Sequence, residues 1–140
     1  GLGRVGCGSF HSLRRLLSNR VVGMDADRKR IDRMKSEGHN VFFGDGEDAD
    51  LWEKFDVSDY KLVLLALPSI EDSSNITIQL RKAGFNGKVA AIARYQDERD
   101  SLITSGIDNV FNFYTEAGNG FAEESIQLLE DNPLSLSQAG

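Results

Sequence analysis

The sequence predicts an α/β fold built on a parallel β-sheet. Apolar residues alternate along the chain between short strand-like runs and stretches with helical spacing. The helical stretches are about ten residues long, which suits the crossovers that join neighbouring parallel strands. A chain of 140 residues is large enough for one domain with its own core. We expect residues 1–130 to form this domain and residues 131–140 to form a polar tail.

The first half of the chain contains three expected helices and two expected strands. Each helix carries apolar residues at helical spacing, and each strand is a short apolar run. Gly38 follows the second helix as a C-terminal stop. The expected helices are Arg4–Ser18, Asp27–Glu37 and Asp48–Phe55, and the expected strands are Arg20–Met24 and Asn40–Phe43.

The second half continues the alternation and begins with the most apolar strand. Residues 61–67 (KLVLLAL) are apolar on both faces, which is typical of a buried parallel strand. Gly84 and Gly106 end the next two helices, and Thr115 is expected to cap the last one. These helices are Ser73–Ala83, Asp97–Ser105 and Glu116–Glu130, and the strands between them are Lys88–Ala93 and Asn109–Tyr114.

Composition and residue spacing exclude several classes of function. The 16 basic and 22 acidic residues give a net charge of −6, which argues against nucleic acid or an anionic membrane surface as the main partner. The single cysteine, Cys7, rules out an intrachain disulfide and is expected to be small buried filler. His11 and His39 are 28 positions apart and show no metal-ligand spacing. No Ser/His/Asp set or Tyr-x-x-x-Lys pair is present, so we expect neither catalytic residues nor a metal site.

The chain opens with a glycine-rich phosphate-binding pattern. Residues 1–6 read GLGRVG, which is G-x-G-x-x-G at the start of a helix. Gly1 permits a tight turn, Gly3 lets a phosphate approach the backbone, and Gly6 lets the helix pack closely. The phosphate would rest on free N–H groups at the positive end of the helix dipole. Arg4 either meets that phosphate or faces solvent.

An acidic residue stands where a nucleotide ribose would bind. Asp25 ends the second apolar run, 22 residues after Gly3. Its carboxylate can accept hydrogen bonds from both ribose hydroxyls and would repel a 2′-phosphate, which favours NAD or AMP over NADP. Asp27 is expected to be the N-cap of the next helix. Arg30 either lies near the ribose or faces solvent.

Three further candidates follow later strands. In the Gly44–Asp45–Gly46 segment, Asp45 could accept a hydrogen bond from an adenine amino group, although an ordinary turn explains the same residues. Leu67 and Pro68 end a strand at the carboxyl edge, where ligands bind in such sheets. Pro68 either lines the pocket or only ends the strand. Arg94, which ends a later strand, either joins the pocket or lies on the surface.

The glycine pattern normally follows a strand, and nothing precedes Gly1 in the printed sequence. In this architecture that strand lies in the middle of the sheet. Without it, two strand edges would be open to association. We therefore expect a longer chain to supply the strand before Gly1.

Six segments carry a resemblance to a known family. They are GLGRVG, VVGMDAD followed by Arg30, FFGDGED, KLVLLALP, KVAAIAR and the TSGI turn at residues 104–107. Together they resemble the TrkA-N domain, the RCK-type regulatory domain of bacterial potassium channels and transporters. The resemblance runs from Gly1 to about Leu129. Within the family, the chain is most similar to the C-terminal domains of Kef-type, glutathione-regulated potassium-efflux antiporters.

The resemblance implies a Rossmann-like, doubly wound parallel sheet of order 3-2-1-4-5-6, whose first strand is missing here. It implies AMP or NAD(H) as the ligand, with its phosphate on the glycine loop, its ribose on Asp25 and its adenine at Asp45. The full candidate set for cofactor binding is Gly1, Gly3, Arg4, Val5, Gly6, Asp25, Ala26, Asp27, Arg30, Gly44, Asp45, Gly46, Leu67 and Pro68.

The resemblance also implies a regulatory role without catalysis. The nucleotide would gate potassium efflux by a potassium/proton antiporter domain of the same full-length protein, at the cytoplasmic face of the bacterial inner membrane. It implies a homodimer, with the last helix as a contact. The residues leave two alternatives open: a fragment of an NAD-dependent oxidoreductase, and a dimerisation module without a ligand.

Overall fold

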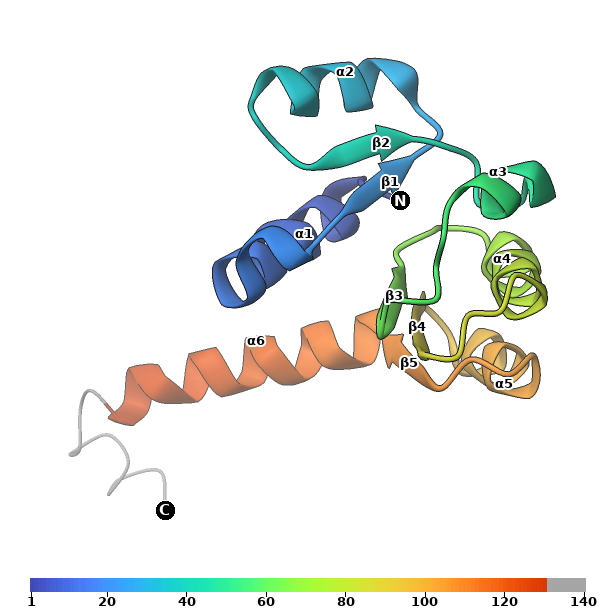
Figure 1. Ribbon diagram of the computed structural model, residues 1–140. Coiled ribbons are helices and arrows are strands. Elements are labelled where there is room, and N and C mark those ends of the chain that lie inside the picture. The colour runs from blue at the N-terminus through green and yellow to red at the C-terminus, as the bar shows by residue number, and fades with distance from the viewer. Residues whose placement is uncertain (131–140) are drawn as a thin grey trace.

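A computed structural model describes residues 1–130 as an α/β fold with two parallel sheets (Figure 1). The expected tail, residues 131–140, lies outside the described residues. The strands are β1 (Gly23–Asp25), β2 (Val41–Phe43), β3 (Leu62–Leu65), β4 (Lys88–Ala93) and β5 (Asn109–Asn112). The helices are α1 (Arg4–Leu17), the 3-10 turn η1 (Ser18–Arg20), α2 (Arg28–Ser36), α3 (Ala49–Lys54), α4 (Ile70–Lys82), α5 (Gln96–Thr104) and α6 (Phe113–Glu130).

The topology confirms the expected parallel α/β class. β1 pairs with β2 in one sheet, and β3, β4 and β5 lie in that order in the other. In the expected order 3-2-1-4-5-6, β2 and β1 take positions 3 and 2. Strands β3, β4 and β5 take positions 4, 5 and 6. Among residues 1–130, no strand joins the two sheets.

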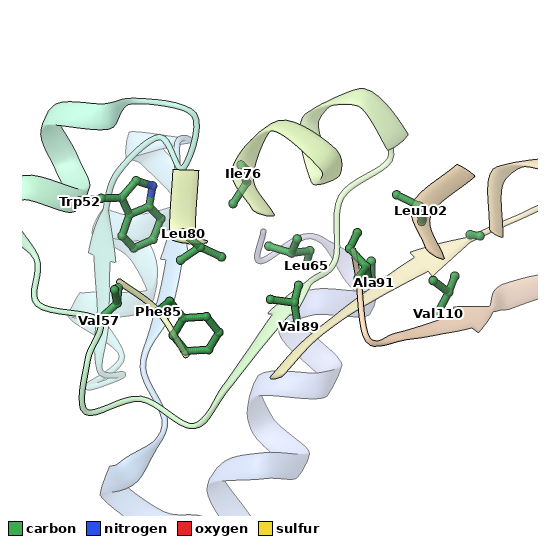
Figure 2. Close-up of a cluster of buried hydrophobic side chains, with 12 residues drawn as sticks. Trp52, Val57, Leu65, Ile76, Leu80, Phe85, Val89, Ala91, Leu102 and Val110 are labelled. Carbon is green, nitrogen blue, oxygen red and sulfur yellow. The ribbon is translucent and has the colours of Figure 1, made fainter. Parts of the chain in front are cut away.

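Helices on opposite sides of the fold create two separate apolar cores. In the larger core, residues of α4 and α5, such as Leu80 and Leu102, pack against strand residues such as Val89 (Figure 2). In the smaller core, Phe10 of α1 and Ile31 of α2 are buried with other apolar side chains. Figure 1 shows this division, with α3, α4 and α5 grouped on one side and α1 and α2 on the other.

Local capping explains where several of the helices begin or end. The expected stop glycines have positive φ angles, which are +85° at Gly38, +92° at Gly84 and +97° at Gly106. The expected start of the fourth helix at Ser73 is wrong by three residues. The Ser69 hydroxyl accepts a hydrogen bond from the Asp72 N–H at 3.2 Å, so α4 begins at Ile70.

The junction between β5 and α6 also differs from expectation. The strand ends at Asn112 rather than Tyr114, and α6 begins directly at Phe113. Thr115 therefore lies inside the helix and is not its N-cap. Its N–H instead donates to the Asn112 side-chain oxygen at 3.4 Å, so Asn112 provides the polar partner expected of Thr115.

The expectation that residues 61–67 are buried on both faces is wrong for β3. Leu65 is buried in the larger core, whereas Leu62 is 48% and Leu64 39% exposed. α4 covers one face of this part of the sheet, while α1 and α2 pack against the β1–β2 sheet instead. β3 is also an edge strand of its own sheet.

The last helix extends away from the body of the fold. Figure 1 shows α6 leaving the end of β5 as a long projection. None of its residues is buried, although Tyr114, Phe121 and Leu128 are large and apolar. Within the described residues, no helix combines the length and the apolar character needed to cross a membrane.

Candidate nucleotide-binding site

The glycine loop is tightly packed at two positions and open at the third. A Cβ on Gly1 would lie 2.7 Å from the Ala66 carbonyl oxygen, and one on Gly6 would overlap the Gly1 carbonyl oxygen. No atom lies within 4 Å of a Cβ placed on Gly3. Gly1 and Gly6 therefore let the loop approach the end of β3, while the backbone at Gly3 borders open space. These are the separate roles that the glycine pattern predicts.

The loop leads into a helix start without a side-chain cap. Gly3 is the N-cap residue of α1 and is extended, with φ −66° and ψ −162°, and no side chain caps the helix. The first turn contains no acidic residue, and both Arg4 and Val5 are exposed. The first N–H groups of a helix have no partner within it. Here they are available to an anion at the positive end of the helix dipole.

Asp25 connects the first strand to the glycine loop. Its Oδ2 accepts a hydrogen bond from the Leu2 N–H at 2.7 Å, and its Oδ1 accepts one from the Asp27 N–H at 2.8 Å. Oδ2 also receives the Arg30 Nη1–H at 3.0 Å. The carboxylate predicted for the ribose therefore lies beside the loop predicted for the phosphate.

The surroundings of Asp25 keep its carboxylate charged. Burial alone would raise the pKa of Asp25. Hydrogen bonds from the Leu2 and Asp27 N–H groups, together with the Arg30 guanidinium, outweigh burial and hold this pKa below its ordinary value. The group is thus an ionised hydrogen-bond acceptor at neutral pH.

The three candidates that follow Asp25 have different surroundings at the start of α2. The Asp27 side chain accepts the Arg30 N–H at 3.1 Å, which confirms Asp27 as the helix N-cap. Ala26 is exposed between the two aspartates. The Arg30 guanidinium contacts the Asp25 carboxylate at 3.0 Å and does not simply face solvent.

The second acidic turn lies at the neighbouring strand end. The Gly44 N–H donates to the Asp25 carbonyl oxygen at 3.0 Å, which places the turn next to Asp25. Asp45 is exposed, and its Oδ1 accepts the Glu47 N–H at 3.0 Å. The side chain that holds this turn is Trp52, which donates its Nε1–H to the Gly46 carbonyl oxygen at 2.7 Å. This contact was not predicted from the sequence. A lone tryptophan just after the turn was the available signal, because a buried indole needs an acceptor.

A cavity of about 280 Å³ borders the glycine loop, and Asp25 is not among the residues that line it. Arg4 and Pro68 both line this cavity. Arg94 also lines it and forms an ion pair with Glu98 at 3.4 Å. The lining residues are Gly3, Arg4, Val5, Ala66, Leu67, Pro68, Ile92, Arg94, Glu98, Phe113 and Tyr114. Sequence reasoning did not identify the two aromatic residues, because they were assigned to a strand.

The two histidines, distant in sequence, lie together away from this site. The His11 and His39 ring centroids are 4.9 Å apart, and Arg14 Nη1 lies 3.2 Å from His39 Nδ1. Over residues 1–130, no group of three His, Cys, Asp or Glu side chains could hold a metal ion. Cys7 is partly buried against the smaller core, as expected for a filler residue.

Solved structures with this fold include three informative examples. The NAD(P)-binding domain of an exopolyphosphatase-related protein from Archaeoglobus fulgidus has a TM-score of 0.82 at 16% identity, with 91% of this chain and 94% of that chain covered. The Kef CTD of Shewanella denitrificans in its AMP-bound form has a TM-score of 0.74 at 20% identity, covering 99% and 84%. The GsuK channel bound to NAD has a TM-score of 0.61 at 20% identity, covering 71% of this chain and 19% of that one.

These similarities establish the fold, and a family profile establishes the family. No curated protein sequence matches the chain. The profile of the TrkA-N domain matches residues 1–113, which is most of the chain and includes the glycine loop, Asp25 and Asp45. The chain therefore belongs to the TrkA-N domain family.

Proposed function

We propose that this domain binds an adenine nucleotide, AMP or NAD(H), and acts as a regulatory module rather than an enzyme. The observation that carries the proposal is the 2.7 Å hydrogen bond from the Leu2 N–H to Asp25. It joins the uncapped, glycine-lined start of α1 to an ionised carboxylate. One group suits a phosphate and the other suits a ribose.

Each part of the nucleotide has a complementary group. The phosphate would approach Gly3, where a Cβ would have no neighbour within 4 Å. The ribose would lie at Asp25, and the adenine amino group would donate to Asp45 at the adjacent turn. The AMP in the similar Kef domain and the NAD in GsuK support this class of ligand.

The domain would work by coupling nucleotide binding to an attached transporter. We place it at the cytoplasmic face of the bacterial inner membrane, as part of a potassium/proton antiporter. Nucleotides can control such a transporter only if they bind its open and closed states with different affinities. The glycine loop contacts the carboxyl ends of both sheets, through Asp25 on one side and Ala66 on the other. A ligand there could therefore change how the two sheets are held.

A potassium-flux assay on the full-length protein in vesicles tests this role. AMP or NADH is expected to change the potassium efflux rate of the wild-type protein. The Asp25→Ala variant should keep basal efflux but lose most of the nucleotide response, because it lacks the ribose carboxylate. Efflux that ignores all adenine nucleotides in the wild type would contradict the regulatory role.

A further inference from the structure

Asp25 is not a free carboxylate. Its two oxygens already accept three hydrogen bonds, from the Leu2 N–H, the Asp27 N–H and the Arg30 guanidinium. A carboxylate offers about four acceptor positions. Only one acceptor position therefore remains for a ribose, although a ribose presents two hydroxyls.

Arg30 is the donor in this set that can move. The other two donors are backbone N–H groups of the glycine loop and of the turn before α2. The Arg30 side chain is 33% exposed, and it contacts Asp25 Oδ2 through Nη1 at 3.0 Å. Among residues 1–130, no other side-chain or carbonyl acceptor holds its guanidinium. A guanidinium has five N–H donors, so most of them are available to a ligand.

The first turn of α2 is basic, although its N-cap, Asp27, is acidic. The first turn of α2 contains Arg28, Lys29 and Arg30 and no acidic residue. Arg28 forms a different contact, because its guanidinium stacks over the Phe43 ring with 4.0 Å to the centroid. Arg30 is therefore the cation that compensates Asp25. The repulsion of a 2′-phosphate expected from a bare aspartate is weakened by this pair.

We propose that Arg30 sets the tolerance of this site for a phosphate on the ribose 2′ oxygen, so that the site accepts 2′-phosphorylated as well as plain adenine nucleotides. The inference rests on the proposed nucleotide site and corrects the selectivity expected from Asp25 alone. When the ribose carries a 2′-hydroxyl, that hydroxyl and the Arg30 guanidinium compete to donate to the Asp25 carboxylate. With a 2′-phosphate, its free N–H groups donate charge-assisted hydrogen bonds to the phosphate oxygens.

Calorimetric titration with two ligands isolates this effect. AMP and adenosine 2′,5′-bisphosphate differ only by the 2′-phosphate, so the ratio of their dissociation constants measures tolerance. The wild-type protein should bind them within about tenfold of each other. Arg30→Gln should weaken the bisphosphate at least about tenfold, as expected for lost bonds to a charged group. AMP affinity should stay the same or increase, because the ribose gains an acceptor.

Arg33→Gln is the matched control, since Arg33 is exposed on the same helix and its removal changes the net charge equally. It should leave the ratio unchanged. Arg30→Lys, which keeps the charge but loses the planar fork, should give an intermediate ratio and provides a second folded variant.

Two results would overturn the inference. One is an equal ratio in Arg30→Gln and Arg33→Gln, and the other is a wild-type preference for AMP greater than about a hundredfold. Failure of the wild-type protein to bind AMP at all would instead contradict the proposed function, so the two failures are distinguishable.

Discussion

Asp25 is the residue on which the site and part of the stability both depend. Its pKa is lowered in the folded protein, because hydrogen bonds from two N–H groups and Arg30 outweigh the effect of burial. The stabilisation it contributes is fully present above the unfolded-state pKa of about 3.9. This stabilisation is lost as the pH falls through the lower pKa of the folded state.

Asp25→Asn should therefore lower the free energy of unfolding at pH 7 by about 1.5–3 kcal/mol, the usual range for hydrogen bonds to a charged group. The difference between variant and wild type should shrink as the pH falls below about 3.9. Urea unfolding at several pH values checks this. A constant difference across the whole range would show that the charge of Asp25 makes no contribution.

For single residues of the site, the sequence predicted the roles that depend on the backbone. Gly1 and Gly6 are needed where the loop packs against its neighbours, and Asp27 caps α2, all as local spacing indicates. The Arg30–Asp25 pair and the Trp52 bond to Gly46 were not assigned. Both depend on side-chain directions, which spacing along the sequence leaves open.

Among the α-helices of the described residues, α6 is the one with no buried residue. Tyr114, Phe121 and Leu128 recur every seven residues, which places them on one face of the helix. Phe121 is 77% and Leu128 is 72% exposed. Such a face suits a second copy of the chain, which is the homodimer contact that the resemblance to the family implies.

The variant Phe121→Ser/Leu128→Ser should convert a dimer to a monomer, because it removes the most exposed large apolar side chains of α6. Analytical ultracentrifugation over a range of protein concentrations measures the change. Glu123→Ser/Glu124→Ser, which alters polar positions of the same helix, should remain dimeric. A wild-type protein that stays monomeric would contradict the role of α6.

Element types were more predictable than element ends. The five strands and six α-helices of residues 1–130 overlap the segments that the apolar pattern indicated, because periodicity reflects burial. The starts of α4 and α6 were placed three residues late. Ser69 and Asn112, rather than the expected residues, provide the polar groups at these starts, and the apolar pattern alone does not identify them.

At the scale of the whole molecule, the glycine loop is where the two sheets meet. The Leu2 N–H donates to the side chain of Asp25, the last residue of β1, while Gly1 packs against Ala66, which follows β3. The parallel order of the strands was predictable from the alternation of elements. The exposure of Leu62 and Leu64 was not, because it depends on which helices cover which sheet.

Since the loop contacts both sheets, a nucleotide bound there should stabilise the molecule as a whole. At a free concentration of 100 times its dissociation constant, a ligand adds about 2.7 kcal/mol to the free energy of unfolding. This stabilisation should accompany binding of AMP or NADH.

Calorimetric titration of AMP into the wild type, Gly3→Ala and Gly8→Ala tests the central claim most directly. A Cβ meets nothing within 4 Å at either glycine, so both variants should fold. Only the Gly3 methyl group would enter the space proposed for the phosphate. We predict that AMP binds the wild type and Gly8→Ala equally, and Gly3→Ala at least about tenfold more weakly, a loss of about 1.4 kcal/mol. Absence of AMP binding to the folded wild type, or equal binding to all three proteins, would contradict nucleotide binding at the glycine loop.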